Sequence, residues 1–193
     1  GIIDQVFLED FNWKKFFKNL GLGVAAILMI GVLMIPFGFS EALKQYTGTL
    51  GSYEYASINA YNFWNMLGLN WSSQYDKLLG IQYKTWGTIA IILTVIVALI
   101  ISYRCKKNSG KYYYIGGFVV TVVFAFAVRM HERYLFPAMV MFIAAFAVRL
   151  RKEMYILYSL ICAVVFYNAA YVLFIYDVNN FDPKAPIPIA ISI

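Results

Sequence analysis

The chain of 193 residues is 62% hydrophobic and 19% aromatic, and only 13% of its residues are charged. Its mean hydropathy is +0.67. Soluble domains carry about 25% charged residues, so this composition excludes an ordinary soluble domain and predicts an all-α, polytopic integral membrane protein. Anionic lipid and membrane topology explain the formal net charge of +6, and we infer no nucleic-acid partner from it.

Apolar stretches without charge predict about five transmembrane helices, since a crossing needs about 20 mostly apolar residues. They cover residues 20–39, 86–103, 112–128, 135–148 and 154–176. The third and fourth stretches are short for a crossing. We take residues 1–193 as a single transmembrane domain. Because Gly1 is not an initiator methionine and no signal peptide opens the chain, we expect a fragment of a larger membrane protein whose N-terminal half is missing.

Clusters of basic residues set the orientation, because short loops rich in lysine and arginine stay in the cytoplasm. The clusters are Lys14, Lys15 and Lys18; Arg104, Lys106, Lys107 and Lys111; and Arg149, Arg151 and Lys152. They place the N-terminal segment 1–19 in the cytoplasm, where residues 13–19 form either a short helix on the membrane surface or an ordinary loop. The tail 177–193, the long loop 40–85 and the short turn RMHERY at 129–134 are then outside.

The outer loop contains the aromatic and amide-rich stretch YEYASINAYNFWNMLGLNW at residues 53–71. We expect a helix over residues 53–67 that ends near Gly68. Helical spacing puts three asparagines on one stripe and two aromatic rings on another: Asn59, Asn62 and Asn65, and Tyr61 and Trp64. An aromatic belt at the headgroups needs no ligand, and composition favours it. The functional alternative is sugar or acceptor binding by Asn59, Tyr61, Asn62 and Trp64.

RMHERY holds two arginines, a glutamate and the only histidine between the two short spans. Ionisable groups near the membrane normally pair with each other or face a water-filled cavity. Helical spacing pairs Arg129 with Glu132, leaves Arg133 free, and puts His131 on the far side with Tyr134; the two arginines could also exchange roles. A self-neutralised cluster would only anchor the turn. One glutamate cannot neutralise two arginines, so the surplus favours an anion site.

Two of these segments carry a family resemblance. HERYLFP at residues 131–137 follows an apolar span, and YASINAYNFWNMLG at residues 55–68 lies in the preceding outer loop. Together they resemble the C-terminal half of bacterial GT-C membrane glycosyltransferases, mannosyltransferases related to the second mannosyltransferase of GPI-anchor synthesis. The resemblance implies a hexosyltransferase that moves a sugar from a polyprenyl-phosphate carrier to a hydroxyl acceptor on the outer face.

For such a transfer, the charges of the RMHERY turn suggest roles for its residues. Arg129, His131 and Arg133 would bind the donor phosphate, whose negative charge grows as the sugar leaves, and Glu132 would hold the guanidinium groups. The acidic base of the family belongs to a first outer loop that this chain lacks, so we expect the chain alone to be inactive and assign no catalytic residue beyond Glu132 as a lesser candidate.

Expected partners are polyprenyl-phosphate-linked sugar, membrane lipids and the missing N-terminal half. We expect no cofactor, and no metal, because the sequence has no Cys or His cluster. Two other classes stay open. A lipid-linked sugar translocator would also bind the phosphate, but should carry polar groups along a path through the spans. A non-catalytic membrane subunit would need no charged cluster.

Overall fold

The computed structural model describes residues 12–105 and 110–176. The expectations for segment 1–11 and for the outer tail 177–193 therefore fall outside the described residues. The chain divides into two compact units, Gly1–Tyr53 and Glu54–Ile193, which are described one at a time.

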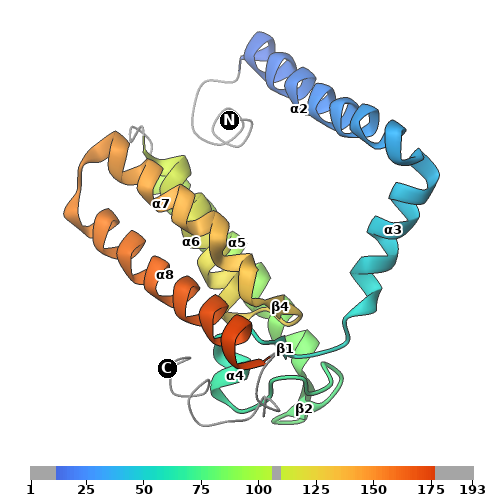
Figure 1. Cartoon of the computed structure of the whole chain (residues 1–193). Helices are drawn as coiled ribbons and strands as arrows, with labels where there is room; N and C mark the ends of the chain where they lie inside the picture. The colour runs from blue at the N-terminus through green and yellow to red at the C-terminus, as the bar shows by residue number, and fades with distance from the viewer. Residues whose placement is uncertain (1–11, 106–109, 177–193) are drawn as a thin grey trace. The chain divides into compact units, whose positions relative to one another are not determined.

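The first unit contains the helix α2 (Trp13–Met34), the short η1 (Ile35–Phe37) and the helix α3 (Phe39–Ser52), shown in blue in Figure 1. Helix α2 starts at Asn12, whose side chain accepts a hydrogen bond from the Lys15 amide at 3.2 Å. It continues through Leu20 without a break, so both alternatives for residues 13–19, a separate surface helix and an ordinary loop, are wrong. Helix α3 occupies the start of the predicted outer loop.

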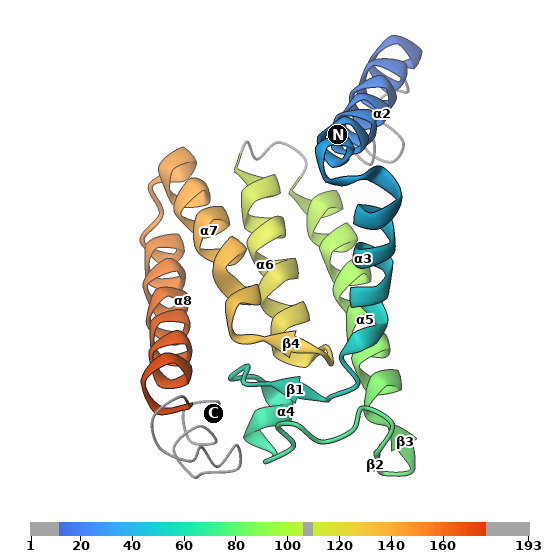
Figure 2. The ribbon, with the colours of Figure 1, turned by 45° about the vertical axis from the view of Figure 1, so that its right-hand side comes forward.

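The second unit is a row of four helices: α5 (Tyr83–Arg104), α6 (Lys111–Phe126), α7 (Phe136–Arg149) and α8 (Lys152–Tyr171), which continues into η3 (Val172–Tyr176). Each helix packs against the next in chain order, as Figure 2 shows from right to left. Exposed apolar side chains such as Ile92, Val140 and Phe166 cover the outside of the row, as expected of surfaces that face lipid.

The described part of the chain has three helices long and apolar enough to cross a membrane: Trp13–Phe37, Tyr83–Arg104 and Lys152–Phe174. Helix α6 has 16 residues and α7 has 14, fewer than the about 20 that usually span a bilayer. The chain is thus mostly helical with membrane-type helices, as predicted, and five crossings remain a prediction.

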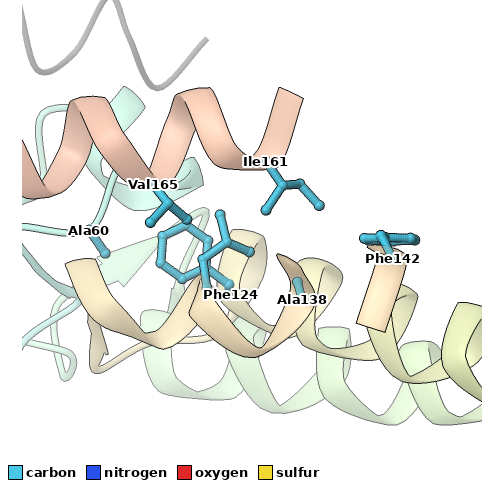
Figure 3. Packing of buried hydrophobic residues seen from close by; sticks show 7 residues of the cluster. Ala60, Phe124, Ala138, Phe142, Ile161 and Val165 are labelled. Carbon is cyan, nitrogen blue, oxygen red and sulfur yellow. The ribbon is translucent and has the colours of Figure 1, made fainter. Parts of the chain in front are cut away.

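The core lies where α6, α7 and α8 meet. Its buried residues are Ala60, Phe124, Leu135, Ala138, Phe142, Ile161 and Val165, and Figure 3 shows the α8 side chains pointing at Phe124 and Ala138. Close approach of α6 and α7 depends on Gly117. A Cβ at that position would lie 2.9 Å from the ring of Phe142, nearer than atoms in van der Waals contact approach.

The loop from Glu54 to Gln82 is mostly extended, so the predicted helix over residues 53–67 is wrong. Strand β1 (Ser57–Ile58) pairs in parallel with β4 (Met130–His131), and β2 (Lys77–Leu78) forms a hairpin with β3 (Ile81–Gln82). Only α4 (Phe63–Met66) is helical, and Gly68, with a φ of 71°, follows it. Pairing with β4 satisfies backbone groups that a helix would otherwise bond internally, and the stripe of three asparagines does not form.

Candidate functional site

Buried amide side chains fasten the loop together and to α8. The Asn59 side-chain oxygen accepts hydrogen bonds from Asn70 Nδ2 at 3.2 Å and Trp71 Nε1 at 2.9 Å. Asn168 of α8 accepts from the Tyr61 amide at 3.0 Å and donates to the Asn59 carbonyl. Asn59 itself has a φ of 56°, a left-handed conformation that asparagine adopts more readily than most residues. Asn59 therefore shapes the loop, and Asn168 holds it against the helices.

A second set of bonds fastens α4 to the end of α6. Asn62 caps α4 by accepting from the Asn65 amide and donates Nδ2 to the Phe124 carbonyl at 3.2 Å. Trp64, only 1% exposed, donates Nε1 to the Phe126 carbonyl at 2.9 Å. These side chains are occupied in positioning the loop. Sugar or acceptor binding by this set remains a prediction.

Tyr61 completes the set of four residues predicted to bind sugar or acceptor. Its ring centroid lies 6.0 Å from that of Tyr171. Burial raises the pKa of its phenol, with Tyr171 contributing. The Tyr61 hydroxyl is buried and has no hydrogen-bond partner among the described residues. It is thus a polar atom at the contact between the loop and α8 that no described contact explains.

The RMHERY turn lies directly beside this loop. The Arg129 amide donates to the Tyr55 carbonyl at 3.1 Å, and an isolated bridge joins Asn59 to His131. Arg129 has a φ of 63°, which is uncommon for a residue other than glycine. The two segments are therefore adjacent. Within the turn, Arg129 is left-handed, Met130 and His131 form β4, and only η2 (Glu132–Leu135) is helical.

The two arginines of the turn have different partners. Arg133 Nη1 lies 3.0 Å from Glu132 Oε1, and the Arg133 side chain is 59% exposed. Arg129 instead donates Nε to Gln74 Oε1 at 2.9 Å. The pairing of Arg129 with Glu132 is therefore wrong, and Glu132 instead pairs with Arg133, as in the exchanged assignment that the sequence left open. Helical spacing suggested the first pairing, and the non-helical backbone removes that spacing, because Arg129 is left-handed and Met130–His131 form β4.

His131, within the turn, is buried where the turn contacts the loop. Its ring packs edge-on against Tyr134 at 5.1 Å between centroids, and Nδ1 lies 3.9 Å from Glu132 Oε2. Burial lowers the His131 pKa from its usual 6.5, the charge of Arg133 lowers it further, and Glu132 partly opposes both. His131 is consequently neutral at pH 7, so it offers an incoming anion hydrogen bonding but no charge.

Arg129 lines an open pocket of about 500 Å³ between the start of α5 and residues 127–130. The cations of the lining are Arg129 and Lys84, and its other polar side chains are Gln74, Thr85 and Thr88. Gly87, Ile91 and three residues of the 127–130 segment supply the apolar wall. None of the described lining residues is acidic. The pocket therefore suits a ligand that joins an anionic group to an apolar chain.

Gln74 is the buried polar residue of this pocket, with 1% of its surface exposed. Its side-chain oxygen Oε1 accepts a hydrogen bond from Arg129 Nε, and its side-chain nitrogen Nε2 has no partner within the part of the chain that the structure describes. An unsatisfied buried amide costs about 1–3 kcal/mol, so an acceptor atom entering the pocket would recover this loss. The same bond holds the guanidinium of Arg129 in place before any ligand arrives.

Lys84, Gln74 and the two threonines were missed by sequence reasoning, which concentrated on RMHERY. One feature of the sequence could have pointed to Lys84. Lys84 precedes an apolar span at its predicted outer end, where the rule that keeps lysine in the cytoplasm disfavours a lysine. Its ammonium lies 4.5 Å from the ring centroid of Tyr75. The pocket brings Lys84 and residues 127–130 together because α5 approaches that segment closely at Gly87, where a Cβ would lie 3.0 Å from the Val128 amide nitrogen.

The described residues contain no group of three or more His, Cys, Asp or Glu side chains that would hold a metal ion. The arrangement offers two cations, a buried amide donor and hydroxyl groups, which is a set for binding an oxyanion. No protein-family model, curated protein or solved structure matches this chain.

Proposed function

We propose that this chain is part of a membrane glycosyltransferase that moves a sugar from a polyprenyl-phosphate carrier to a hydroxyl acceptor on the outer face, and that the pocket of Lys84 and Arg129 binds the carrier phosphate. The observation that carries the proposal is the lining of this pocket: two cations and the buried Gln74 amide beside an apolar wall. The resemblance in residues 55–68 and 131–137 supports the choice of sugar transfer.

The polar half of the pocket fits a phosphate. Arginine presents a planar set of donors that matches phosphate oxygens, while lysine acts as a compact point charge. Gln74 fixes the guanidinium of Arg129 through a 2.9 Å bond to Nε, so little reorganisation is needed on binding. Such preorganised cations stabilise negative charge more than mobile ones do.

The apolar half of the pocket fits the start of a prenyl chain. Gly87 and Ile91 lie on α5, and Ala127 and Val128 face them. Helix α5 is long and apolar enough to cross a membrane, so a chain that leaves the pocket along it stays in the lipid phase. A free sugar phosphate would gain nothing from this wall.

The chemistry requires charge stabilisation at the phosphate. In the transfer, the bond between the anomeric carbon and the phosphate oxygen breaks, a bond to the acceptor oxygen forms, and the acceptor hydroxyl gives up its proton. Negative charge grows on the departing phosphate, which Lys84 and Arg129 would stabilise. Glu132 accepts from Arg133, which keeps it a lesser candidate for the base.

Binding by the full chain in detergent tests the proposal. We expect Lys84→Ala to weaken binding of polyprenyl-phosphate-linked sugar about 10-fold or more, the usual loss for one charge-assisted hydrogen bond. Lys77→Ala is the matched control, because Lys77 is exposed on β2 and outside the pocket lining. Equal affinities of both variants and the unmodified chain would overturn the assignment.

Transfer assays separate the alternative functions. Bound carrier that crosses the bilayer without sugar transfer would indicate a translocator. No carrier binding would indicate a non-catalytic subunit. Transfer to a hydroxyl acceptor that disappears together with carrier binding is the result expected of the proposed enzyme.

A further inference from the structure

A second basic pocket lies at the other end of the helix row. It has a volume of about 340 Å³, and its charged lining residues are Lys111, Arg149, Arg151 and Glu153. Cys105, at the end of α5, also lines it. Helix α5 has 22 residues and is about 33 Å long, so the pocket is far from Lys84 and cannot belong to the site described above.

The charges of this pocket are unbalanced. Glu153 Oε2 lies 3.4 Å from Arg151 Nε. Three cations against one carboxylate leave a surplus of two positive charges in the described lining. Like charges gathered in one pocket repel each other, and an anion placed among them removes this repulsion.

The helix ends strengthen the attraction for an anion. Lys111 is the first residue of α6, and Arg151 is the N-cap of α8. Neither helix start has a side-chain capping bond. The positive end of a helix dipole disfavours a cation and favours an anion. Arg149 differs from these two residues, because it lies in the last turn of α7, where the negative end of the helix dipole favours a cation.

Lys111 is also buried in this pocket. The residue is only 5% exposed, and its ammonium lies 5.1 Å from the ring centroid of Tyr112. A buried lysine at a helix start, beside two arginines, is thus an arrangement that an anionic ligand would stabilise.

We propose that this pocket binds the phosphodiester headgroup of an anionic phospholipid. The remaining lining is largely apolar, with Ile101, Ala145 and Met154 at the ends of α5, α7 and α8. It therefore lies where membrane-type helices begin and end, at headgroup level. Basic pockets between transmembrane helices on the cytoplasmic side bind such headgroups, and the basic clusters predict that this end is cytoplasmic. The inference does not depend on the proposed glycosyltransferase.

Lipid binding by the full chain in detergent tests the inference, with phosphatidylglycerol and phosphatidylcholine as probes and native mass spectrometry as the readout. We expect phosphatidylglycerol to bind about 10-fold more tightly than phosphatidylcholine. Lys111→Gln and Arg149→Gln should each weaken phosphatidylglycerol binding about 10-fold. Lys152→Gln is the control, because it removes the same charge from an exposed residue next to Arg151 that does not line the pocket.

Three results would overturn the inference. Equal binding of both lipids would exclude a headgroup site, and an equal loss in Lys152→Gln would indicate diffuse attraction of the whole surface. Displacement of phosphatidylglycerol by millimolar inorganic phosphate would identify the ligand as free phosphate. Arg149 is exposed, so Arg149→Gln keeps the test valid if Lys111→Gln does not fold. Binding of polyprenyl-phosphate-linked sugar should be unchanged in all these variants, which separates this site from the proposed donor site.

Discussion

The helix row and the polar layer formed by the loop and the RMHERY turn are held together by different forces. Helices α6 and α7 meet through close apolar contact, as at Gly117 and Phe142. The loop and the RMHERY turn are joined to the helices by buried hydrogen bonds, as at Asn168 and Trp64. Apolar contact suits surfaces inside a membrane, whereas directional bonds fix a loop in one conformation. The candidate phosphate pocket lies where the two kinds of packing meet.

The largest loss of stability is expected from a substitution in the polar layer. Asn168→Leu leaves the Tyr61 amide and the Asn59 carbonyl without their buried partner. Each lost partner costs about 1–3 kcal/mol, so we expect the free energy of unfolding in detergent to fall by about 3 kcal/mol. Tyr167→Leu, at the exposed neighbouring position on α8, should change it by less than about 0.5 kcal/mol. Similar values for the two variants would show that the layer does not depend on these bonds.

The next largest loss of stability is expected in the helix row, from a steric clash. Gly117→Ala places a Cβ 2.9 Å from the Phe142 ring, and overpacking of this kind costs about 1–3 kcal/mol. The structure offers a graded control in Gly116→Ala, where the nearest atom is the flexible Met141 sulfur at 3.2 Å. We expect Gly116→Ala to cost less, measured by thermal unfolding in detergent. An equal cost at both glycines would contradict the packing described for α6 and α7.

A smaller effect concerns pH and the buried His131. Its folded pKa is lowered from 6.5 by burial and by Arg133, with Glu132 opposing. The unfolded chain therefore takes up the proton first as pH falls, and stability that is complete above about 6.5 is lost between that value and the folded pKa. The melting temperature should drop between pH 7.5 and 5.5. His131→Asn should reduce that drop, and an unchanged drop would exclude His131 as its source.

The helices were more predictable than the polar layer. The predicted span 86–103 falls inside α5, because a run of apolar residues needs no distant contact to be recognised. The loop differs, since β1 pairs with β4 more than 70 residues later and no local pattern encodes that contact. Asn62 did carry a local signal for a helix start at Phe63, but the spacing of the asparagines suggested a longer helix.

The candidate site was predicted in part for the same reason. The sequence singled out both the loop and the turn as candidate segments, and the structure brings them together, with Asn59 beside His131. Which arginine lines a pocket could not be inferred, because it depends on Gln74, 55 residues away, bonding Arg129, while Glu132 bonds its direct neighbour Arg133.

The most direct measurement compares Arg129→Gln with Arg133→Gln in binding polyprenyl-phosphate-linked sugar. Both variants remove one guanidinium from RMHERY, but only Arg129 lines the pocket. We predict a loss of about 10-fold or more for Arg129→Gln and less than about threefold for Arg133→Gln, whose side chain is largely exposed and paired with Glu132. Arg129→Lys should recover part of the affinity, since it keeps the charge without the planar donor set. The reverse order, with Arg133→Gln the weaker binder, would contradict the assignment of the donor phosphate to the pocket of Lys84 and Arg129.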